Sequence, residues 1–202
     1  MNPRIAFIAA PLLTLAYGVI RILDGLDGSR GPGIAWTTGH LAFIAAMGSF
    51  VHIFWQMRRM AGGNALSTVI AGIATAGALA LITQFTIDVV AGLLSADNLS
   101  MSLLIRDIRA TPGVTLAAYD IGPYLFYIGQ FALVVQLAVM RRIKMWTPFL
   151  VLVDLIMPNI DKDLIPLGAI LLLVSFVSIS HRGAPAVSRQ VPPVTEPVAT
   201  RV

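Results

Sequence analysis

The chain has 202 residues, of which 57% are hydrophobic and only 12% are charged. Such a composition is too apolar for an ordinary soluble domain, and it indicates an integral membrane protein whose first partner is the lipid bilayer. The net charge is +4, but the arginines lie in short runs beside apolar segments, where they set membrane topology, so we exclude nucleic acid as a partner. The chain has no cysteine, which excludes disulfides and thiolate chemistry.

Six apolar segments follow one another along the chain, bounded by charged and turn residues. They cover residues 5–23, 34–57, 66–95, 114–140, 146–159 and 164–180. The first four are long enough to cross about 30 Å of hydrocarbon at about 1.5 Å per residue. The last two are short, so residues 146–180 form either a pair of spans or a re-entrant hairpin. We therefore predict an all-α integral membrane protein, with residues 1–182 as a single bundle of about six transmembrane helices.

Basic residues gather at one end of every second segment. The second, fourth and sixth segments end at Arg58-Arg59, Arg141-Arg142-Ile143-Lys144 and His181-Arg182. Because lysine and arginine are enriched in cytoplasmic loops, these three ends are expected in the cytoplasm. The protein is then a multi-pass protein of the cell membrane with both termini on the cytoplasmic side.

Two stretches lie outside the predicted spans. Residues 98–109 read either as a short amphipathic helix on the outer membrane interface or as a polar loop. Residues 183–202 are rich in proline and have no helical period, which predicts a disordered cytoplasmic tail.

Ionisable residues inside spans are the main functional clue. Each costs about 2.5–3.5 kcal/mol at the centre of a spanning helix, unless it faces a cavity or a partner. In the first segment Arg21 and Asp24 are three residues apart, so they can pair on one helical face. In the second segment we expect His40 to be a histidine of the outer half. His52 follows in the same helix, but a haem pair needs four histidine ligands and the chain has three, so we favour hydrogen-bonded histidines over haem.

The third segment carries small residues that give way to polar ones at every fourth position. This series is Gly72, Ala76, Ala80, Gln84, Asp88 and Gly92. Such a ridge predicts close packing against a neighbouring helix and places Gln84 and Asp88 in the bundle interior. Asp88 is read equally well as a functional acid or as a buried structural one.

The last three segments add two carboxylates. Asp120, Tyr124 and Tyr127 share one face of the fourth segment, where a carboxylate beside phenols could relay a proton or bind a cation. The tyrosines fit an aromatic belt at the outer interface better, whereas Asp120 is expected in the interior. Asp154 precedes Pro158, a helix breaker of the kind that lines transporter cavities but also occurs where a hairpin turns.

With the predicted topology, the candidate residues converge on the outer half of the bundle. They are Arg21, Asp24, His40, Gln84, Asp88, Asp120, Tyr124 and Asp154. Together they predict an outer-facing acidic polar cavity, suited to a proton, a metal cation or a cationic or hydroxylated ligand.

Three functions are compatible with such a cavity. The first is a small proton- or cation-coupled transporter or channel, which we prefer. The second is an intramembrane enzyme acting on a lipid-like or isoprenoid substrate, with an aspartate as general acid. The third is an accessory subunit without chemistry, which uses its small-residue ridge to bind a helix of a partner or of a second copy. No nucleophile elbow, phosphate loop or zinc-binding helix occurs in the sequence, and no cofactor or reaction is assigned.

Overall fold

The computed structural model describes residues 3–26 and 28–182, and this part of the chain is helical without any strand. The prediction of an all-α fold is confirmed. The predicted tail, residues 183–202, lies outside the described residues. The helices are α1 (Pro3–Asp24), α2 (Ile34–Met60), α3 (Ala65–Leu94), α4 (Asn98–Arg109), α5 (Gly122–Val139), α6 (Thr147–Ile160) and α7 (Ile165–Arg182), with a π-helix at Thr115–Ile121 and a 3-10 turn at Lys162–Leu164.

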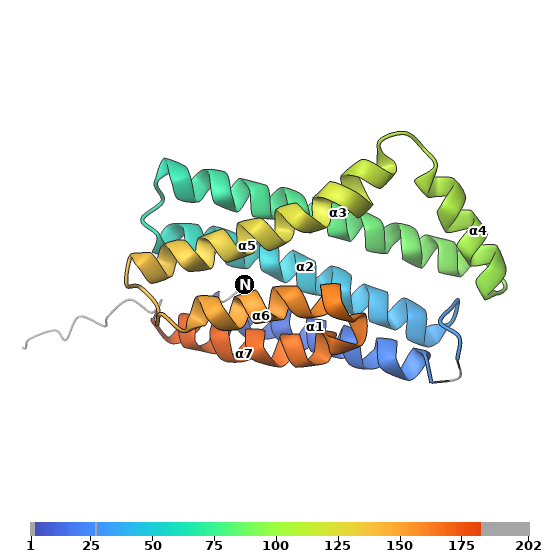
Figure 1. Ribbon diagram of the computed structural model, residues 1–202, viewed down its shortest axis with the longest axis horizontal. Coiled ribbons are helices and arrows are strands. Elements are labelled where there is room, and N and C mark those ends of the chain that lie inside the picture. Colours follow the sequence, from blue (N-terminus) through green and yellow to red (C-terminus); the bar gives the residue numbers. More distant parts are fainter. Residues whose placement is uncertain (1–2, 27, 183–202) are drawn as a thin grey trace, which may run out of the picture.

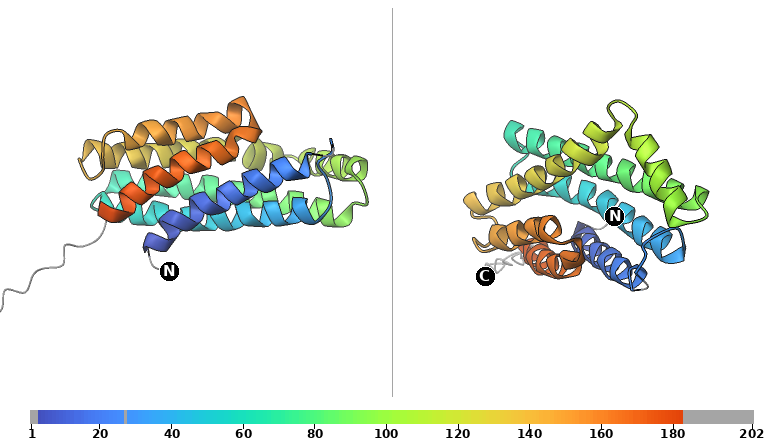
Figure 2. Two further views of the ribbon diagram at one scale, coloured as in Figure 1. Left: turned by 90° about the horizontal axis from the view of Figure 1, so that it is seen from below. Right: turned by 45° about the vertical axis from the view of Figure 1, so that its right-hand side comes forward.

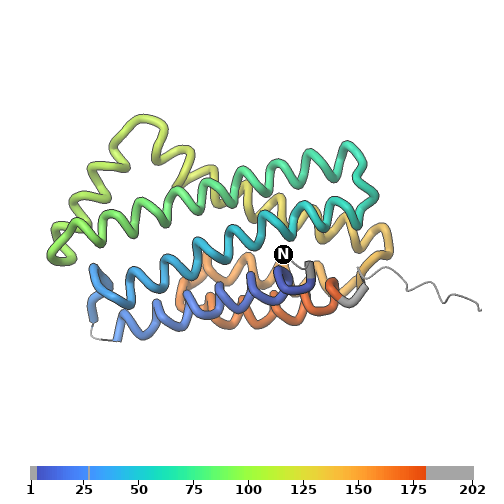
Figure 3. The backbone as a smooth tube through the Cα atoms, turned by 180° about the vertical axis from the view of Figure 1, so that it is seen from behind, coloured from blue at the N-terminus to red at the C-terminus, as the bar shows by residue number. Residues whose placement is uncertain are grey.

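Six of these helices form a closed ring, in which each packs against two neighbours. In order around the ring, α1 packs on α2, α2 on α3, α3 on α5, α5 on α6, α6 on α7, and α7 returns to α1. Seen from behind, α1 lies alongside α2 with α7 on its other side (Figure 3). The ring leaves α4 outside, beyond the end of α3 (Figure 1). Any space inside the ring is therefore enclosed by helices from the whole length of the chain.

The two ends of the bundle differ in charge. The connections from α2 to α3 and from α5 to α6 lie at one end, with Arg58, Arg59, Arg141 and Arg142, and we name it the arginine end (Figure 1). The connections from α1 to α2 and from α3 to α4 lie at the opposite end, the loop end. Both the start of α1 and the end of α7 point towards the arginine end (Figure 2).

Five helices are long and apolar enough to cross a membrane. They span 21, 27, 30, 25 and 19 residues, at Arg4–Asp24, Ile34–Met60, Ala65–Leu94, Thr115–Val139 and Lys162–Ser180. The remaining ring helix, α6, is apolar but has only 14 residues. Many large apolar side chains point outward from the ring, among them Leu79, Val139 and Phe149. Such outward surfaces are typical of bundles that face lipid.

Small residues let α3 and α5 approach each other closely. A Cβ added at Gly77 would overlap the backbone of Phe126, and one added at Gly129 would lie 2.6 Å from the Cα of Ala74. The expected ridge is only partly correct, because Gly72 has no neighbour within 4 Å and Ala76 is exposed. The packing face is rotated towards Ala74 and Gly77, with Ala80 in contact where it meets Gly122.

Aromatic rings fill the arginine half of the bundle. Phe50 of α2 lies 5.1 Å from Phe126 of α5 and 5.8 Å from Phe176 of α7, measured between ring centroids. Phe176 in turn contacts Phe7 of α1 at 5.5 Å. We name Phe7, Phe50, Phe126 and Phe176 the aromatic plug. Rings at these distances make favourable edge-to-face contacts, so the plug joins α1, α2, α5 and α7 in the arginine half of the bundle.

Residues 98–109 form a helix, α4, so the prediction of a helix is confirmed and the polar loop is wrong. Its place at the outer membrane interface stays a prediction. Asp97 caps α4: its carboxylate accepts hydrogen bonds from the backbone N–H of Ser100 at 2.8 Å and from the Ser100 hydroxyl at 2.9 Å. The Ser100 hydroxyl oxygen also accepts from the backbone N–H of Asp97 at 3.3 Å, which completes a capping box. The hydrogen bonds from Ser100 lower the pKa of the Asp97 carboxyl below its usual range.

The fourth predicted span begins with a π-helix instead of an α-helix. Pro123 stands near the start of α5, and a proline has no N–H and clashes with the carbonyl four residues earlier. The wider π turn at Thr115–Ile121 is a known way to pass such an obstacle within a continuous helix. Each π turn also rotates the side chains that precede it relative to those of α5.

Candidate functional site

A cavity of about 410 Å³ lies inside the ring, and all six ring helices contribute side chains to its wall. On α2 its wall runs from Ala35, beside the loop end, to Phe50 of the aromatic plug. At about 1.5 Å per residue this stretch covers roughly 22 Å. The cavity therefore reaches from the loop end to the middle of the bundle. Its volume is within the range of small-molecule sites, about 300–1,000 Å³.

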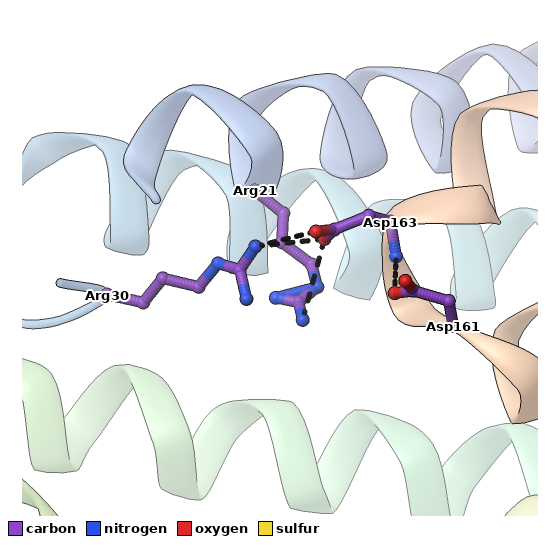
Figure 4. Close-up of polar contacts among 4 residues, drawn as sticks. All are labelled: Arg21, Arg30, Asp161 and Asp163. Carbon is purple, nitrogen blue, oxygen red and sulfur yellow. Dashed lines mark hydrogen bonds and ion pairs between the residues drawn. The ribbon is translucent and has the colours of Figure 1, made fainter. Parts of the chain in front are cut away.

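An ion cluster stands at the outer part of this cavity (Figure 4). Arg30, from the connection between α1 and α2, donates to both carboxylate oxygens of Asp163 at 2.9 and 3.0 Å. The guanidinium of Arg21 on α1 lies 3.8 Å from the same carboxylate. Asp161 accepts a hydrogen bond from the backbone N–H of Asp163 at 2.8 Å, which fixes the turn. The cluster ties the turn between α6 and α7 to α1 and its loop.

A histidine and an aspartate face each other near the mouth of the cavity. His40 Nδ1 donates to the carbonyl oxygen of Trp36 at 2.7 Å, because a carbonyl can only accept. His40 Nε2 then lies 3.9 Å from the carboxylate of Asp88. With its proton on Nδ1, a neutral His40 has only an acceptor at Nε2, and an ionised Asp88 also has only acceptors. The contact is attractive only when either Nε2 or the Asp88 carboxyl group carries a further proton. The Tyr119 hydroxyl donates to Asp88 at 3.4 Å. His40 and Asp88 are therefore a candidate pair for proton exchange.

Trp36 holds this pair in place. Its indole N–H donates to the backbone carbonyl of Asp88 at 3.1 Å, and its ring lies 4.0 Å from the His40 ring between centroids. Gly92, one turn further along α3, makes room for the indole, since an added Cβ would lie 2.8 Å from it. The candidate pair is therefore positioned by packing between α2 and α3.

The inner carboxylate is Asp154 on α6, which is only 8% exposed. Gly168 of α7 gives it space, because a Cβ at that position would lie 2.7 Å from Asp154 Oδ1. Pro158 follows four residues later and has no N–H, so the Asp154 carbonyl lacks its usual helical donor. No hydrogen bond or ion pair joins the Asp154 carboxylate to another residue within 3–26 and 28–182.

A second unsatisfied polar group lines the same cavity. Gln130 of α5 is completely buried, and neither its amide oxygen nor its amide nitrogen has a hydrogen-bond partner in the described part of the chain. It lies nine residues before the end of α5, and Asp154 lies seven residues after the start of α6. The two helices are antiparallel neighbours, so the two groups are about 14 and 11 Å from the connection that joins them. Gln130 and Asp154 therefore share a level near the inner end of the cavity.

Most of the predicted site residues meet in this cavity. Its wall includes Arg21, Asp24, His40, Gln84, Asp88, Tyr124 and Asp154. Asp120 does not belong to the wall and is exposed. The expectation that it shares a face with Tyr124 assumed α-helical spacing across the π-helical stretch, where that spacing does not hold. Tyr119, five residues before Tyr124, faces Asp88 instead.

Sequence reasoning left several polar residues of the wall out of the predicted site, among them Arg30, Gln130 and Lys162. Gln130 carries no charge and sits in an apolar run, so only its burial distinguishes it. The ion pair of Arg21 with Asp163 joins residues far apart in the sequence, and the pairing of Arg21 with Asp24, one turn away, stays a prediction. Residues in loops and turns gain such partners only through the tertiary fold.

Metal and haem ligation find no support in the described residues. No group of three or more histidine, cysteine, aspartate or glutamate side chains within residues 3–26 and 28–182 could hold a metal ion. Both ring nitrogens of His40 face protein groups, and His52 Nε2 lies 3.3 Å from the side-chain nitrogen of Gln56 in its own helix. Both histidines have the protein partners expected of hydrogen-bonded residues.

Comparison with protein-family models, with curated proteins and with solved structures found no match to this chain. Its function is therefore inferred from the cavity and the residues that line it. Chemically, the cavity offers a candidate pair for proton exchange near its mouth, a buried carboxylate and an amide at its inner end, and aromatic walls between them.

Proposed function

We propose that this protein is a small membrane transporter that moves protons or a protonated solute through an outer-facing cavity. The observation that carries this proposal is the cavity itself, which leads from the loop end to the middle of the ring and is lined by the carboxylates of Asp24, Asp88 and Asp154. Asp88 lies at its mouth and Asp154 lies at its inner end. Ionisable groups at such depth in a membrane bundle mark ion or proton pathways by default.

The proposed setting is a six-span bundle with the arginine end in the cytoplasm. The arginines at that end support this orientation through the positive-inside rule. Both described ends of the chain point the same way, as an even number of crossings requires (Figure 2). In this arrangement α6 and α7 cross as a short pair, and the ion cluster of Arg21, Arg30 and Asp163 lies near the outer surface.

The aromatic plug gives the proposal its gate. In this proposal the cavity opens towards the loop end, and the packed rings of Phe50, Phe126 and Phe176 close it towards the arginine end. Transport then requires a second state in which these rings separate and the mouth closes. The ion cluster at the outer turn is suited to that movement, because exposed ion pairs contribute little stability and break easily.

The proton or an organic cation fits this cavity better than a metal ion. Metal transport and a metal-dependent enzyme both need a group of oxygen or nitrogen ligands, and no three histidine, cysteine, aspartate or glutamate side chains gather into such a group among the described residues. His40 and Asp88, in contrast, face each other at 3.9 Å, and one proton on either group would make the contact attractive. An accessory role would use the small residues on the outer face of α3, where Gly72 and Ala76 are open.

Proton movement into proteoliposomes tests this proposal. The full chain is reconstituted with a trapped pH-sensitive dye, a potassium diffusion potential is imposed, and internal acidification is followed with and without added amines, sodium or potassium. We expect protein-dependent acidification under at least one of these gradients. The Asp154→Asn variant should lose it, whereas Asp120→Asn, at an acid outside the cavity, should retain it.

Two results would contradict transport. One is the absence of protein-dependent proton or charge movement under every gradient. The other is equal flux in Asp154→Asn and in the unmodified protein. If Gly72→Leu on the outer face removes a bound partner protein while Asp154→Asn changes nothing, the accessory role is supported instead.

A further inference from the structure

We infer that the inner end of the cavity binds a protonated arylalkylamine, with its ammonium group at Asp154 and its polar or ring portion beside Gln130. The inference rests on the proposed function, because it names the class of solute that the transporter would carry. It is drawn from two buried side chains without partners and from the aromatic walls that surround them.

Asp154 places an uncompensated acidic group at the inner end of the cavity. Asp154 is 8% exposed and has no cationic partner in the described part of the chain. A buried carboxylate without a partner is unfavourable, and a ligand with the opposite charge removes that penalty. The Asp154 carbonyl, deprived of its donor by Pro158, is a further acceptor. An ammonium group has up to three N–H donors and matches several acceptors at once.

The cations of the cavity wall lie nearer to the loop end than Asp154 does. Arg21 and Arg30 are held by Asp163 in the outer ion cluster. Lys162, the third cation of the wall, belongs to the turn before α7, six residues from Gly168 towards the loop end. Gly18 of α1 packs directly against Pro166 of α7, and Arg21 lies three residues from it towards the loop end. Gly168, which contacts Asp154, lies two residues beyond Pro166 in the other direction. At about 1.5 Å per residue the two levels differ by roughly 7 Å, so Asp154 lies deeper than the arginines.

The Gln130 amide lies at the same level as Asp154. Gln130 is fully buried, lines the cavity and leaves both ends of its amide without a partner in the described residues. Buried amides are almost always hydrogen-bonded. Because the amide atoms are covered in the ligand-free protein, the Gln130 side chain must rotate towards the cavity, where a ligand with a donor or acceptor at the level of Asp154 would satisfy it. Gln136, in the same helix, also has an unpartnered amide oxygen but lies outside the cavity wall, and it therefore serves as a matched control.

The cavity walls beside these two groups are aromatic. Tyr17, Phe50, Phe126 and Tyr127 line the cavity together with the two polar groups. Aromatic faces attract organic cations, especially where water is excluded, and they pack against a ligand ring. A cavity of about 410 Å³ is large enough for a one- or two-ring amine. Aromatic walls with one carboxylate favour an amine over an inorganic cation, which would need more oxygen ligands.

Calorimetric titration of the purified full chain in detergent tests this inference. The probes are phenethylamine and tryptamine, with 2-phenylethanol as the neutral match and phenylacetate as the anionic match. We expect saturable binding of at least one amine, and at least tenfold weaker binding of the alcohol and of phenylacetate. Asp154→Asn should weaken amine binding at least tenfold, whereas Asp120→Asn should leave it unchanged.

The amide is tested with Gln130→Met and its control Gln136→Met. Gln130→Met should weaken amine binding and at the same time raise the Tm of the ligand-free protein, because it removes a buried polar group without a partner. Gln136→Met should leave binding unchanged. A purely structural role for Gln130 would lower Tm and affinity together.

The outcomes separate this inference from the proposed function. If no amine binds, or if alcohol and amine bind equally, the amine site is wrong, and transport still stands where proton flux depends on Asp154. If an amine binds with the expected dependence on Asp154 and Gln130 but no gradient moves protons or charge, the amine site stands and transport is wrong.

Discussion

The close contact between α3 and α5 predicts opposite effects for two glycines of the same helix. A Cβ at Gly77 would overlap the backbone nitrogen of Phe126 and lie 2.6 Å from its Cα, whereas one at Gly72 would meet nothing within 4 Å. A backbone cannot rotate away as a side chain can, so Gly77→Ala must push the helices apart. Overpacking of this kind lowers stability by about 1–3 kcal/mol. Gly72→Ala should instead be neutral or stabilise by up to about 1 kcal/mol, through helix propensity.

Thermal unfolding of the detergent-solubilised protein measures both effects. For a chain of this length each kcal/mol corresponds to about 2–4 °C in Tm, so Gly77→Ala should unfold about 2–12 °C earlier. Gly72→Ala should unfold at the same temperature or slightly later. Equal destabilisation by the two substitutions, or a larger loss at Gly72, would refute the assigned packing face and restore the ridge expected from the sequence.

Other contacts lead to predictions of the same kind. Gly92→Ala should displace the Trp36 indole and break its hydrogen bond to α3, seen as a red shift in tryptophan fluorescence; an unchanged spectrum would contradict the packing. Asp163→Asn removes the bidentate partner of Arg30, so stability should change by less than about 1 kcal/mol while tryptic cleavage after Arg30 becomes faster. Because the pKa of Asp97 is lowered in the folded protein, its cap on α4 should be present at neutral pH and lost as the pH falls through that lowered value. Asp97→Ala should therefore speed amide exchange in α4 at neutral pH, with a difference that disappears in acid.

The helices could be predicted because their signal is local. Apolar runs bounded by charges gave the ring helices within a few residues, and the capping residues Asp97 and Ser100 lie beside the helix that they start. The number of membrane crossings could not be fixed in this way. Residues 146–180 hold a short helix and a long one, and whether α6 crosses depends on the membrane around it.

The site was predictable where helical spacing held and not where it changed. His40, Asp88 and Asp154 were found because an ionisable residue in an apolar helix is conspicuous. Asp120 was misplaced because the π turn before Pro123 changes the spacing of the face. Gln130 was overlooked because an uncharged amide stands out only when its burial and its missing partners are known.

Labelling of single cysteines shows whether the cavity opens to water on the outer side only, as the proposed transport requires. The chain has no cysteine of its own, so Gln84→Cys in the cavity wall and Leu79→Cys on the outward face of α3 can each be introduced alone. A membrane-impermeant thiol reagent is applied to each side of oriented vesicles. We expect Gln84→Cys to react from the outer side only and Leu79→Cys to react from neither side. Labelling of Gln84→Cys from the cytoplasmic side only, or no labelling from either side, would contradict the outer opening of the cavity.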